Sequence, residues 1–281
     1  MSVARDGEFE LITLRTGSRA VRHLVSGEVM HPAVGPWEEA RRLYVDQLDP
    51  LARLRLDDGQ PLRVLDVGLG AATNAVALLT AVRESGPFPR HLEVVSLERD
   101  LAPLRLALAD PEGFPFLRPW AAAAEALMEN GRWEGEGVTW RLLVGDIHET
   151  LAQAGGGFEV VFYDPFSPKA NPTLWTPALL ARIRAACRED EAGAVLATYS
   201  AATPTRVSFL LAGFYVGAGV ATGGKLETTV ASTRPGLLAS PLGSRWLARW
   251  ERSSARGPHG APLTEADEAA VRGHPQLERF T

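Results

Sequence analysis

Short apolar runs alternate with helical segments along most of the chain. Runs that predict buried parallel strands lie at residues 62–67, 92–97, 139–144, 160–163 and 193–199. Segments with helical spacing follow them, at residues 73–82, 101–135, 149–154, 176–187 and 204–212. Strands that alternate with helices in this way predict an α/β fold built on a parallel sheet.

The last part of this pattern refines the fold class. Residues 214–221 and 226–232 flank the turn Thr222-Gly223-Gly224-Lys225 and predict a β-hairpin. Five β-α units closed by a hairpin, with a reversed last strand beside the fifth, are typical of the Rossmann-like sheet of class I methyltransferases. A nicotinamide-binding Rossmann domain would continue with another crossover instead.

The pattern divides the chain into three parts. Residues 1–60 predict strands at 9–14 and 21–26 and a helix over 37–48, all packing on the core. Residues 61–233 form the predicted Rossmann-like methyltransferase domain. Residues 234–281 are a C-terminal extension, with Trp246 and Trp250 on one short predicted helix and a loose tail from about Ser253.

Composition and charge narrow the possible partners. A chain of 281 residues that is 46% hydrophobic can build a full core. Its longest apolar run falls short of the roughly 18 residues of a membrane span, and its N-terminus does not match a signal peptide, so we expect a cytoplasmic protein with no membrane partner. The single cysteine, Cys187, predicts neither an internal disulfide nor a metal site. A net charge of −5 argues against a large nucleic-acid-binding surface and leaves a local basic patch open.

A glycine turn joins the first strand of the Rossmann-like domain to its helix. Gly68 and Gly70 allow a tight turn and let a ligand approach bare backbone. Thr73 stands where a dinucleotide fingerprint would have its third glycine, so the motif alone is a weak signal. Asp66 directly before the turn, together with an acid at the end of the next strand, favours a cofactor turn.

Further acids follow other strands. Glu98 ends the second strand, where a Rossmann-like fold places the acid that holds the ribose hydroxyls; the alternative is a surface acid at a strand end. Asp146 follows the third strand and can accept a hydrogen bond from an adenine amino group or cap the next helix. Glu38 and Glu39 either complement a helix dipole or belong to a segment that folds over the cofactor cleft, where Glu39 would contact the cofactor.

The fourth strand, residues 160–163, ends abruptly in Asp164 and Pro165. Proline cannot continue a central strand, so the chain must leave the sheet there and present the carboxylate at its carboxyl edge. Pro165, Pro168 and Pro172 stiffen the loop, as a positioned site requires. We assign the substrate side to residues of this loop: Phe166, Lys169, Asn171 and Trp175. For Trp175, packing in the core is the alternative.

The order of these groups predicts S-adenosylmethionine as the cofactor. The cofactor needs backbone room for its methionine part, an acid for the ribose, an acceptor for the adenine and a wall that guides the sulfonium toward the acceptor. The glycine turn, Glu98, Asp146 and Asp164 follow successive strands in that order. Asp164-Pro165-Phe166 resembles the motif of amino-methylating enzymes, although one proline is missing. An anionic Asp164 suits an amine that must lose a proton before it attacks, so we assign it the catalytic role.

Three stretches resemble the MnmC-type S-adenosylmethionine-dependent methyltransferase family. They are Leu65-Asp66-Val67-Gly68-Leu69-Gly70-Ala71-Ala72-Thr73-Asn74, Gly145-Asp146-Ile147-His148-Glu149 and the loop from Phe162 to Thr176, joined by Ala197-Thr198-Tyr199-Ser200 and by Glu38-Glu39 before Arg41. The resemblance runs over roughly residues 26–233. It implies methylation of the aminomethyl group on a modified wobble uridine, with tRNA as a transient partner. By position it assigns cofactor contacts to Gly68, Gly70, Asn74, Glu98 and Asp146, and the substrate-side acid to Asp164.

Two departures from the family pattern keep other functions open. Leu69, Ala71 and Ala72 replace the family's Gly-Phe-Gly-Thr-Gly loop, and Gly223-Gly224-Lys225-Leu226-Glu227 replaces its basic run near the last hairpin. The alternatives are methylation of a small amine or natural product, aminopropyl transfer, and a non-catalytic cofactor- or RNA-binding module. Scattered arginines either gather into a phosphate-binding face or are solvated surface: Arg15, Arg19, Arg22, Arg41, Arg42, Arg245 and Arg249.

Overall fold

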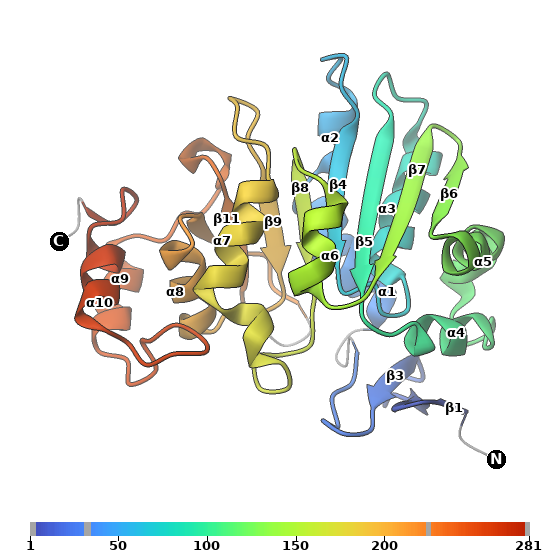
Figure 1. The fold of residues 1–281 in the computed structure, drawn as a ribbon, viewed down its shortest axis with the longest axis horizontal. Helices are drawn as coiled ribbons and strands as arrows, with labels where there is room; N and C mark the ends of the chain where they lie inside the picture. The colour runs from blue at the N-terminus through green and yellow to red at the C-terminus, as the bar shows by residue number, and fades with distance from the viewer. Residues whose placement is uncertain (1–3, 31–34, 223–225, 279–281) are drawn as a thin grey trace.

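The computed structural model describes residues 4–30, 35–222 and 226–278. Within them the main sheet has eight strands in the order β10-β11-β9-β8-β4-β5-β7-β6 (Figure 1). These strands are β4 (Leu62–Val67), β5 (Leu92–Glu98), β6 (Arg132–Gly135), β7 (Val138–Val144), β8 (Val160–Tyr163), β9 (Val195–Thr198), β10 (Tyr215–Gly219) and β11 (Thr228–Ser232). Because β7, β5, β4, β8 and β9 run parallel, their carboxyl ends share one edge of the sheet, the carboxyl edge.

Helices cover both faces of this sheet (Figure 1). Successive side chains of a buried strand point to opposite faces, so Val64 of β4 joins one apolar core and Leu65 joins the other. The first core includes α3 (Thr73–Ser85), and the second includes α6 (Ile147–Ala154), α7 (Pro177–Ala186) and α8 (Thr203–Leu211). The other helices are α1 (Pro36–Ala40), η1 (Arg41–Asp46), α2 (Pro50–Leu54), α4 (Ala102–Leu108), η2 (Pro115–Trp120), α5 (Ala121–Asn130), η3 (Pro172–Trp175), η4 (Pro235–Leu237), α9 (Ser244–Glu251) and α10 (Glu265–Arg272).

The closing hairpin has the predicted topology. Strand β11 lies between β9 and β10 and pairs antiparallel with both. This reversed strand beside the fifth parallel strand confirms the class I methyltransferase sheet. Residues 223–225 of the predicted turn, which stand where the family has its basic run, lie outside the described residues.

The prediction of a helical segment over residues 101–135 is wrong at its end. Strand β6 pairs antiparallel with β7 and adds a strand to the edge of the sheet. Gly131 ends α5 with φ +68°, and Glu136 and Gly137 form a tight turn with φ +53° and +76°. A Gly-Glu-Gly turn next to a strand indicates a β-hairpin, and the prediction of a helical segment did not take this signal into account.

The loose tail predicted from about Ser253 is also wrong. Helix α10 begins with a capping box in which Thr264 and Asp267 bond reciprocally, and it buries Val271. The side chain of Gln276 then accepts a hydrogen bond from Val216 N–H at 2.8 Å and donates one to Leu242 O at 2.9 Å. Burial of apolar side chains and satisfied backbone groups therefore fix this extension against α8 and β10.

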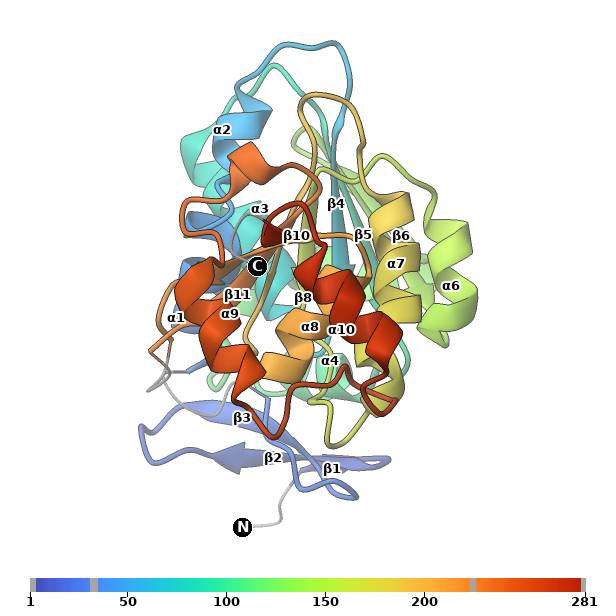
Figure 2. The same ribbon diagram turned by 90° about the vertical axis from the view of Figure 1, so that its left-hand side faces the viewer.

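A small second sheet lies beyond the carboxyl edge (Figures 1 and 2). It contains β1 (Arg5–Asp6), β2 (Phe9–Thr13) and β3 (Arg19–His23), paired antiparallel, and it packs against α4. Its position places the N-terminal segment next to the residues that follow the parallel strands.

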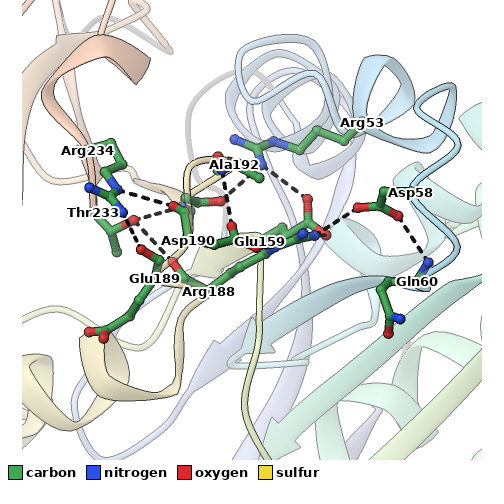
Figure 3. Close-up of polar contacts among 12 residues, drawn as sticks. Arg53, Asp58, Gln60, Glu159, Arg188, Glu189, Asp190, Ala192, Thr233 and Arg234 are labelled. Atoms are coloured by element: carbon green, nitrogen blue, oxygen red, sulfur yellow. Dashed lines mark hydrogen bonds and ion pairs between the residues drawn. The ribbon is translucent and has the colours of Figure 1, made fainter.

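The opposite, amino edge of the main sheet is joined by an ion-pair network around Glu159 (Figure 3). Glu159 is 1% exposed and precedes β8. Its carboxylate accepts hydrogen bonds from Arg53 Nη1 at 3.3 Å and Arg188 Nη1 at 2.9 Å, and from both terminal nitrogens of Arg90. The network therefore ties α2, the start of β5, the start of β8 and the end of α7 together through one buried acid.

Among the described residues, the helices are all too short or too polar to cross a membrane. The same residues contain no cluster of three His, Cys, Asp or Glu side chains arranged to hold a metal ion.

Candidate active site

The glycine turn and the loop after β8 are in direct backbone contact. Gly68 and Gly70 adopt φ values of +87° and +53°, which glycine reaches without strain. A Cβ atom on Gly68 would lie 2.7 Å from the carbonyl oxygen of Asp164, and Asp164 N–H donates to Val67 O at 3.0 Å. Two predicted site elements that are about a hundred residues apart in sequence are thus brought together at the carboxyl edge because β4 and β8 are adjacent parallel strands.

We expect Gly68→Ala to lower the free energy of unfolding by about 1–3 kcal/mol, because it combines a left-handed backbone with a clash against Asp164 O. Affinity for S-adenosylmethionine should fall as well, since the turn must move. Thermal unfolding and calorimetric titration measure the two effects. Gly59→Ala is the matched control, because Gly59 has φ +70° and open space around the added methyl group. Equal losses in both variants would show that the contact with Asp164 is unimportant.

Glu98 closes the other side of the glycine turn. Its Oε2 accepts the N–H of Gly70 at 2.8 Å, and its Oε1 accepts those of Arg99 at 2.6 Å and Asp100 at 3.0 Å. Burial raises the pKa of Glu98, and the three N–H groups oppose this by stabilising the anion. The carboxylate at the end of β5 is therefore held in a fixed orientation beside the turn.

Asp66 lies beneath the turn and is fully buried. Its Oδ2 accepts a hydrogen bond from Ser96 Oγ at 2.7 Å, and Ser96 Oγ in turn accepts one from Trp140 Nε1 at 3.0 Å. Burial raises the pKa of Asp66 to about 7, with smaller contributions in the same direction from the Asp164 and Glu98 carboxylates. Proton exchange at this carboxyl thus falls within the physiological range of pH.

Several buried polar atoms around the turn have no hydrogen-bond partner among the described residues. They are Asp66 Oδ1, Thr73 Oγ1 and Asn74 Oδ1. Buried polar atoms without partners are rare unless a ligand or water completes them. Acceptors gathered at a glycine turn suit the ammonium group of a methionine part, so the residues present fit S-adenosylmethionine.

Asp164 sits among hydroxyl groups and a second acid. Asn74 Nδ2 donates to Asp164 Oδ2 at 2.8 Å. Burial raises the pKa of Tyr44 in η1 and of Tyr199 after β9, and the negative charges of Asp164 and Glu39 raise both further. Glu39 is only 8% exposed, so it belongs to this buried group of polar side chains and not to a solvated first helical turn.

The sequence did not single out Tyr44 as a site residue, because a tyrosine on an apolar helix face carries no motif. Tyr199 lay in a stretch shared with the family, Ala197-Thr198-Tyr199-Ser200, but without an assigned role. A buried tyrosine hydroxyl needs a polar partner. This need is the one signal that could have linked these two tyrosines to a polar site.

The loop from Asp164 to Thr176 is fixed along its backbone. Tyr199 Oη donates to Pro165 O at 3.0 Å, and Trp175 Nε1 donates to Phe166 O at 2.9 Å. Trp175 is 0% exposed and packs edge-to-face against Tyr163 and Tyr199. The assignment of Trp175 to substrate binding is therefore wrong, because its buried indole instead shapes the loop from behind.

The remaining loop residues differ in their surroundings. The Phe166 ring is half-buried and lies 6.4 Å from the ring of Phe9 and 5.4 Å from that of His23. Asn171 stabilises the loop itself, because its N–H donates to Ser167 O at 2.8 Å and its Oδ1 accepts from Thr173 Oγ1 at 3.0 Å. Lys169 is exposed at the tip of the loop.

Asp146 caps helix α6, since its Oδ1 accepts the N–H of His148 at 2.8 Å. This is one of the two interpretations of the sequence; the adenine contact stays a prediction. Asp146 is exposed at the carboxyl edge after β7. Its carboxylate can therefore cap α6 and still accept a further hydrogen bond from a ligand.

Three of the arginines of the predicted basic face pair with acids of the chain. Arg19 pairs with Asp110 at 2.8 Å, and Arg22 pairs with the buried Glu10. On the extension, Arg249 lies 3.8 Å from Glu227. Acids of the chain itself thus neutralise these arginines in place of phosphates.

Comparisons with known proteins agree with this geometry. Residues 116–234 match a family model described as S-adenosyl-L-methionine-dependent methyltransferase. The tRNA 5-methylaminomethyl-2-thiouridine biosynthesis bifunctional protein MnmC of Methylibium petroleiphilum is 31% identical over 231 residues, which cover 79% of this chain and 34% of that protein. The protein of the same name from Aromatoleum aromaticum is 32% identical over 204 residues, covering 67% and 30%. The chain thus spans about a third of the length of the curated relatives it matches.

A solved structure supports the fold over nearly the whole chain. The crystal structure of MNMC2 from Aquifex aeolicus covers 98% of this chain, which in turn covers 86% of that one, with a TM-score of 0.72 and 24% identity. The family model and the relatives together show an S-adenosyl-L-methionine-dependent methyltransferase that resembles the MnmC proteins over most of its length, and S-adenosyl-L-methionine is its cofactor.

Proposed function

We propose that this methyltransferase acts on nitrogen, methylating the aminomethyl group of a modified wobble uridine in tRNA. The observation that carries the proposal is the contact between the glycine turn and the Asp164 backbone, which sets a carboxylate beside the cofactor turn. The name of the MnmC relatives, whose sequences resemble this chain across the same elements, supports tRNA as the substrate.

The residues divide the work of binding as follows. The backbone of Gly68 and Gly70, with Asp66 and Asn74, holds the methionine part of S-adenosylmethionine. Glu98 accepts the ribose hydroxyls, and Asp146 accepts the adenine amino group. Glu39 closes the cleft from α1. When bound, the cofactor supplies an activated methyl group on a sulfonium.

Asp164 prepares the acceptor for this transfer. An alkylamine enters as an ammonium ion at neutral pH, and its nitrogen has no free electron pair until a proton leaves. The Asp164 carboxylate accepts that proton, and Asn74 Nδ2 holds the carboxylate in place. The nitrogen then has a free electron pair with which to take up the methyl group that bound S-adenosylmethionine would supply. Phe166, Lys169 and Asn171 lie on the same loop and face the rest of the acceptor.

The decisive experiment is mass spectrometry of tRNA nucleosides from a strain that lacks this protein. The aminomethyl nucleoside should accumulate at the expense of its methylated product, and adding the purified protein with S-adenosylmethionine should restore the methylated form in vitro. An unchanged nucleoside profile in the deletion strain would contradict the proposal.

The paired state of Arg19 and Arg22 and the net charge of −5 favour a second candidate, a small amine as the acceptor. The salt dependence of binding separates the two. We expect tRNA affinity to fall by orders of magnitude between about 50 and 200 mM salt, because binding releases counterions from phosphates. Fluorescence titration of labelled tRNA at several salt concentrations measures the slope. A flat response would favour the small amine.

A further inference from the structure

The loop that carries Asp164 lies between the two segments of the chain that are outside the eight-stranded sheet. It leaves β8 at Asp164 and ends at Thr176, the cap of α7. The N-terminal segment reaches its first half and the C-terminal extension reaches its second half. Neither segment contributes a strand to the main sheet. Their contacts with the loop are therefore not a by-product of forming that sheet.

On the N-terminal side, Glu28 binds the loop three residues after Asp164. Its carboxylate accepts the Ser167 N–H at 3.0 Å and also accepts the Ser167 hydroxyl. Two donors from one residue to one carboxylate fix both the backbone and the side chain, and bonds to a charged acceptor are the strong ones. The neighbouring Phe166 packs its ring against Phe9 and His23 of the small sheet.

On the C-terminal side, the loop is held at its far end. The His259 ring lies 6.1 Å from the Trp175 ring, and His259 is itself fixed because its Nε2 bonds Thr205 Oγ1 at 3.0 Å and its N–H donates to Ser208 Oγ at 3.0 Å. The next residue, Gly260, approaches so closely that a Cβ atom would lie 2.7 Å from Thr176 Cγ2. The indole N–H of Trp175 in turn donates to Phe166 O, so the far end of the loop is bonded to its beginning.

We propose that Glu28 and His259 are positioning residues for methyl transfer, through which the two outlying segments hold the acceptor loop so that Asp164 faces the cofactor. A catalytic carboxylate must be held within roughly half an ångström of its productive place, and a loop without regular structure does not achieve this alone. The proposal rests on the role given to Asp164 under Proposed function. It explains why the chain retains a second sheet and an ordered extension beside a complete methyltransferase sheet.

The first test uses Glu28→Ala, Ser167→Ala and the double variant, assayed with tRNA that carries the unmethylated aminomethyl nucleoside. We expect kcat to fall by between about tenfold and a hundredfold for Glu28→Ala, with the dissociation constant for S-adenosylmethionine within about twofold and the melting temperature nearly unchanged. The double variant should be no worse than Glu28→Ala, since Glu28→Ala already removes the hydroxyl bond that Ser167→Ala loses as well as the bond from the Ser167 N–H. Independent, multiplicative losses would overturn the proposal.

A conservative variant separates positioning from charge. In Glu28→Gln the amide oxygen still accepts the Ser167 N–H while the amide N–H₂ donates to the hydroxyl, so most of the lost kcat should return. A variant as poor as Glu28→Ala would show that the negative charge matters instead of the positioning. Glu84→Gln is the control, because Glu84 is an exposed acid at the end of α3, outside the small sheet and the loop.

The second test addresses the other end of the loop. His259→Ala should lower kcat by a similar factor and leave cofactor affinity unchanged, whereas Glu251→Gln, an exposed change on the same extension, should have no effect. Asp164→Asn, measured in parallel, separates a failure of the proposed function from a failure of the positioning role of Glu28 and His259. If Asp164→Asn stays active, the proposed function fails. If it is inactive while Glu28→Ala and His259→Ala keep the wild-type kcat, the positioning inference alone is wrong.

Discussion

Asp164→Asn is expected to lower methyl transfer by about 10³-fold, within the range that general bases contribute. In the unmodified protein, Asn74 Nδ2 donates a hydrogen bond to Asp164 Oδ2. The amide of the variant has nearly the same shape, so its oxygen can still accept this bond. What disappears is the capacity to take a proton from the acceptor ammonium. Because the backbone contacts of residue 164 with Val67 and Gly68 stay, affinity for S-adenosylmethionine should change by less than about tenfold.

Two measurements on the same preparation check this prediction. Calorimetric titration gives the affinity for S-adenosylmethionine, and transfer of a labelled methyl group to tRNA gives the turnover. Asp46→Asn is a suitable control, since Asp46 is exposed on η1. Turnover close to that of the unmodified protein would remove Asp164 from the mechanism.

Glu159→Ala is expected to be the most destabilising single change, at about 3–5 kcal/mol of the free energy of unfolding. The substitution removes the buried carboxylate that Arg90, which is 4% exposed, shares with Arg53 and Arg188. It leaves Asp58, whose side chain is 31% exposed and lies 3.2 Å from Arg90 Nε, as an acid beside that guanidinium. The cost arises because these guanidinium groups lose their most buried carboxylate, and the acids that stay beside Arg90 and Arg188 are more exposed. The melting temperature should fall by roughly 10 °C.

The position of Glu159 sharpens the test. It lies at the amino edge of the sheet, opposite Asp164, so activity measured well below the melting temperature should persist. Glu189→Ala is the control, because the Glu189 carboxylate is exposed and pairs with a peripheral arginine, Arg184. Thermal unfolding of the two variants gives the comparison, and a Glu159→Ala protein as stable as the control would contradict the structural role of the network.

The regular part of the fold could be predicted from the sequence because its signals are local. The run that became β8 is continuous and apolar, the run that became β4 is rich in branched apolar residues, and the two segments of the hairpin flank a pair of glycines in the sequence. Strand β6 was missed because its alternation is weak, with Trp133 packed edge-to-face on Trp120 as its main apolar contact. The order of the end of the extension was missed because Gln276 is held by bonds to the distant backbone of Val216 and Leu242, which composition does not reveal.

The same distinction applies to the site. Glycines and acids at strand ends were placed correctly because parallel strands deliver their carboxyl ends to one edge. The roles of Trp175 and Tyr44 depend on which face of a loop or helix is buried. For Tyr44 this is decided only when α1 and η1 pack against α3, and for Trp175 only when the loop packs against Tyr163 and Tyr199. Glu28 lies 139 residues from its partner Ser167, a separation at which no sequence pattern gives a signal.

The absence of a side chain at Gly68 has a mechanical consequence. No flexible group separates the cofactor turn from the peptide bond that follows Asp164, so a displacement of either backbone is passed directly to the other. If Asp164 acts as the base, as proposed, binding of the cofactor at the turn and the position of the Asp164 carboxylate are mechanically coupled.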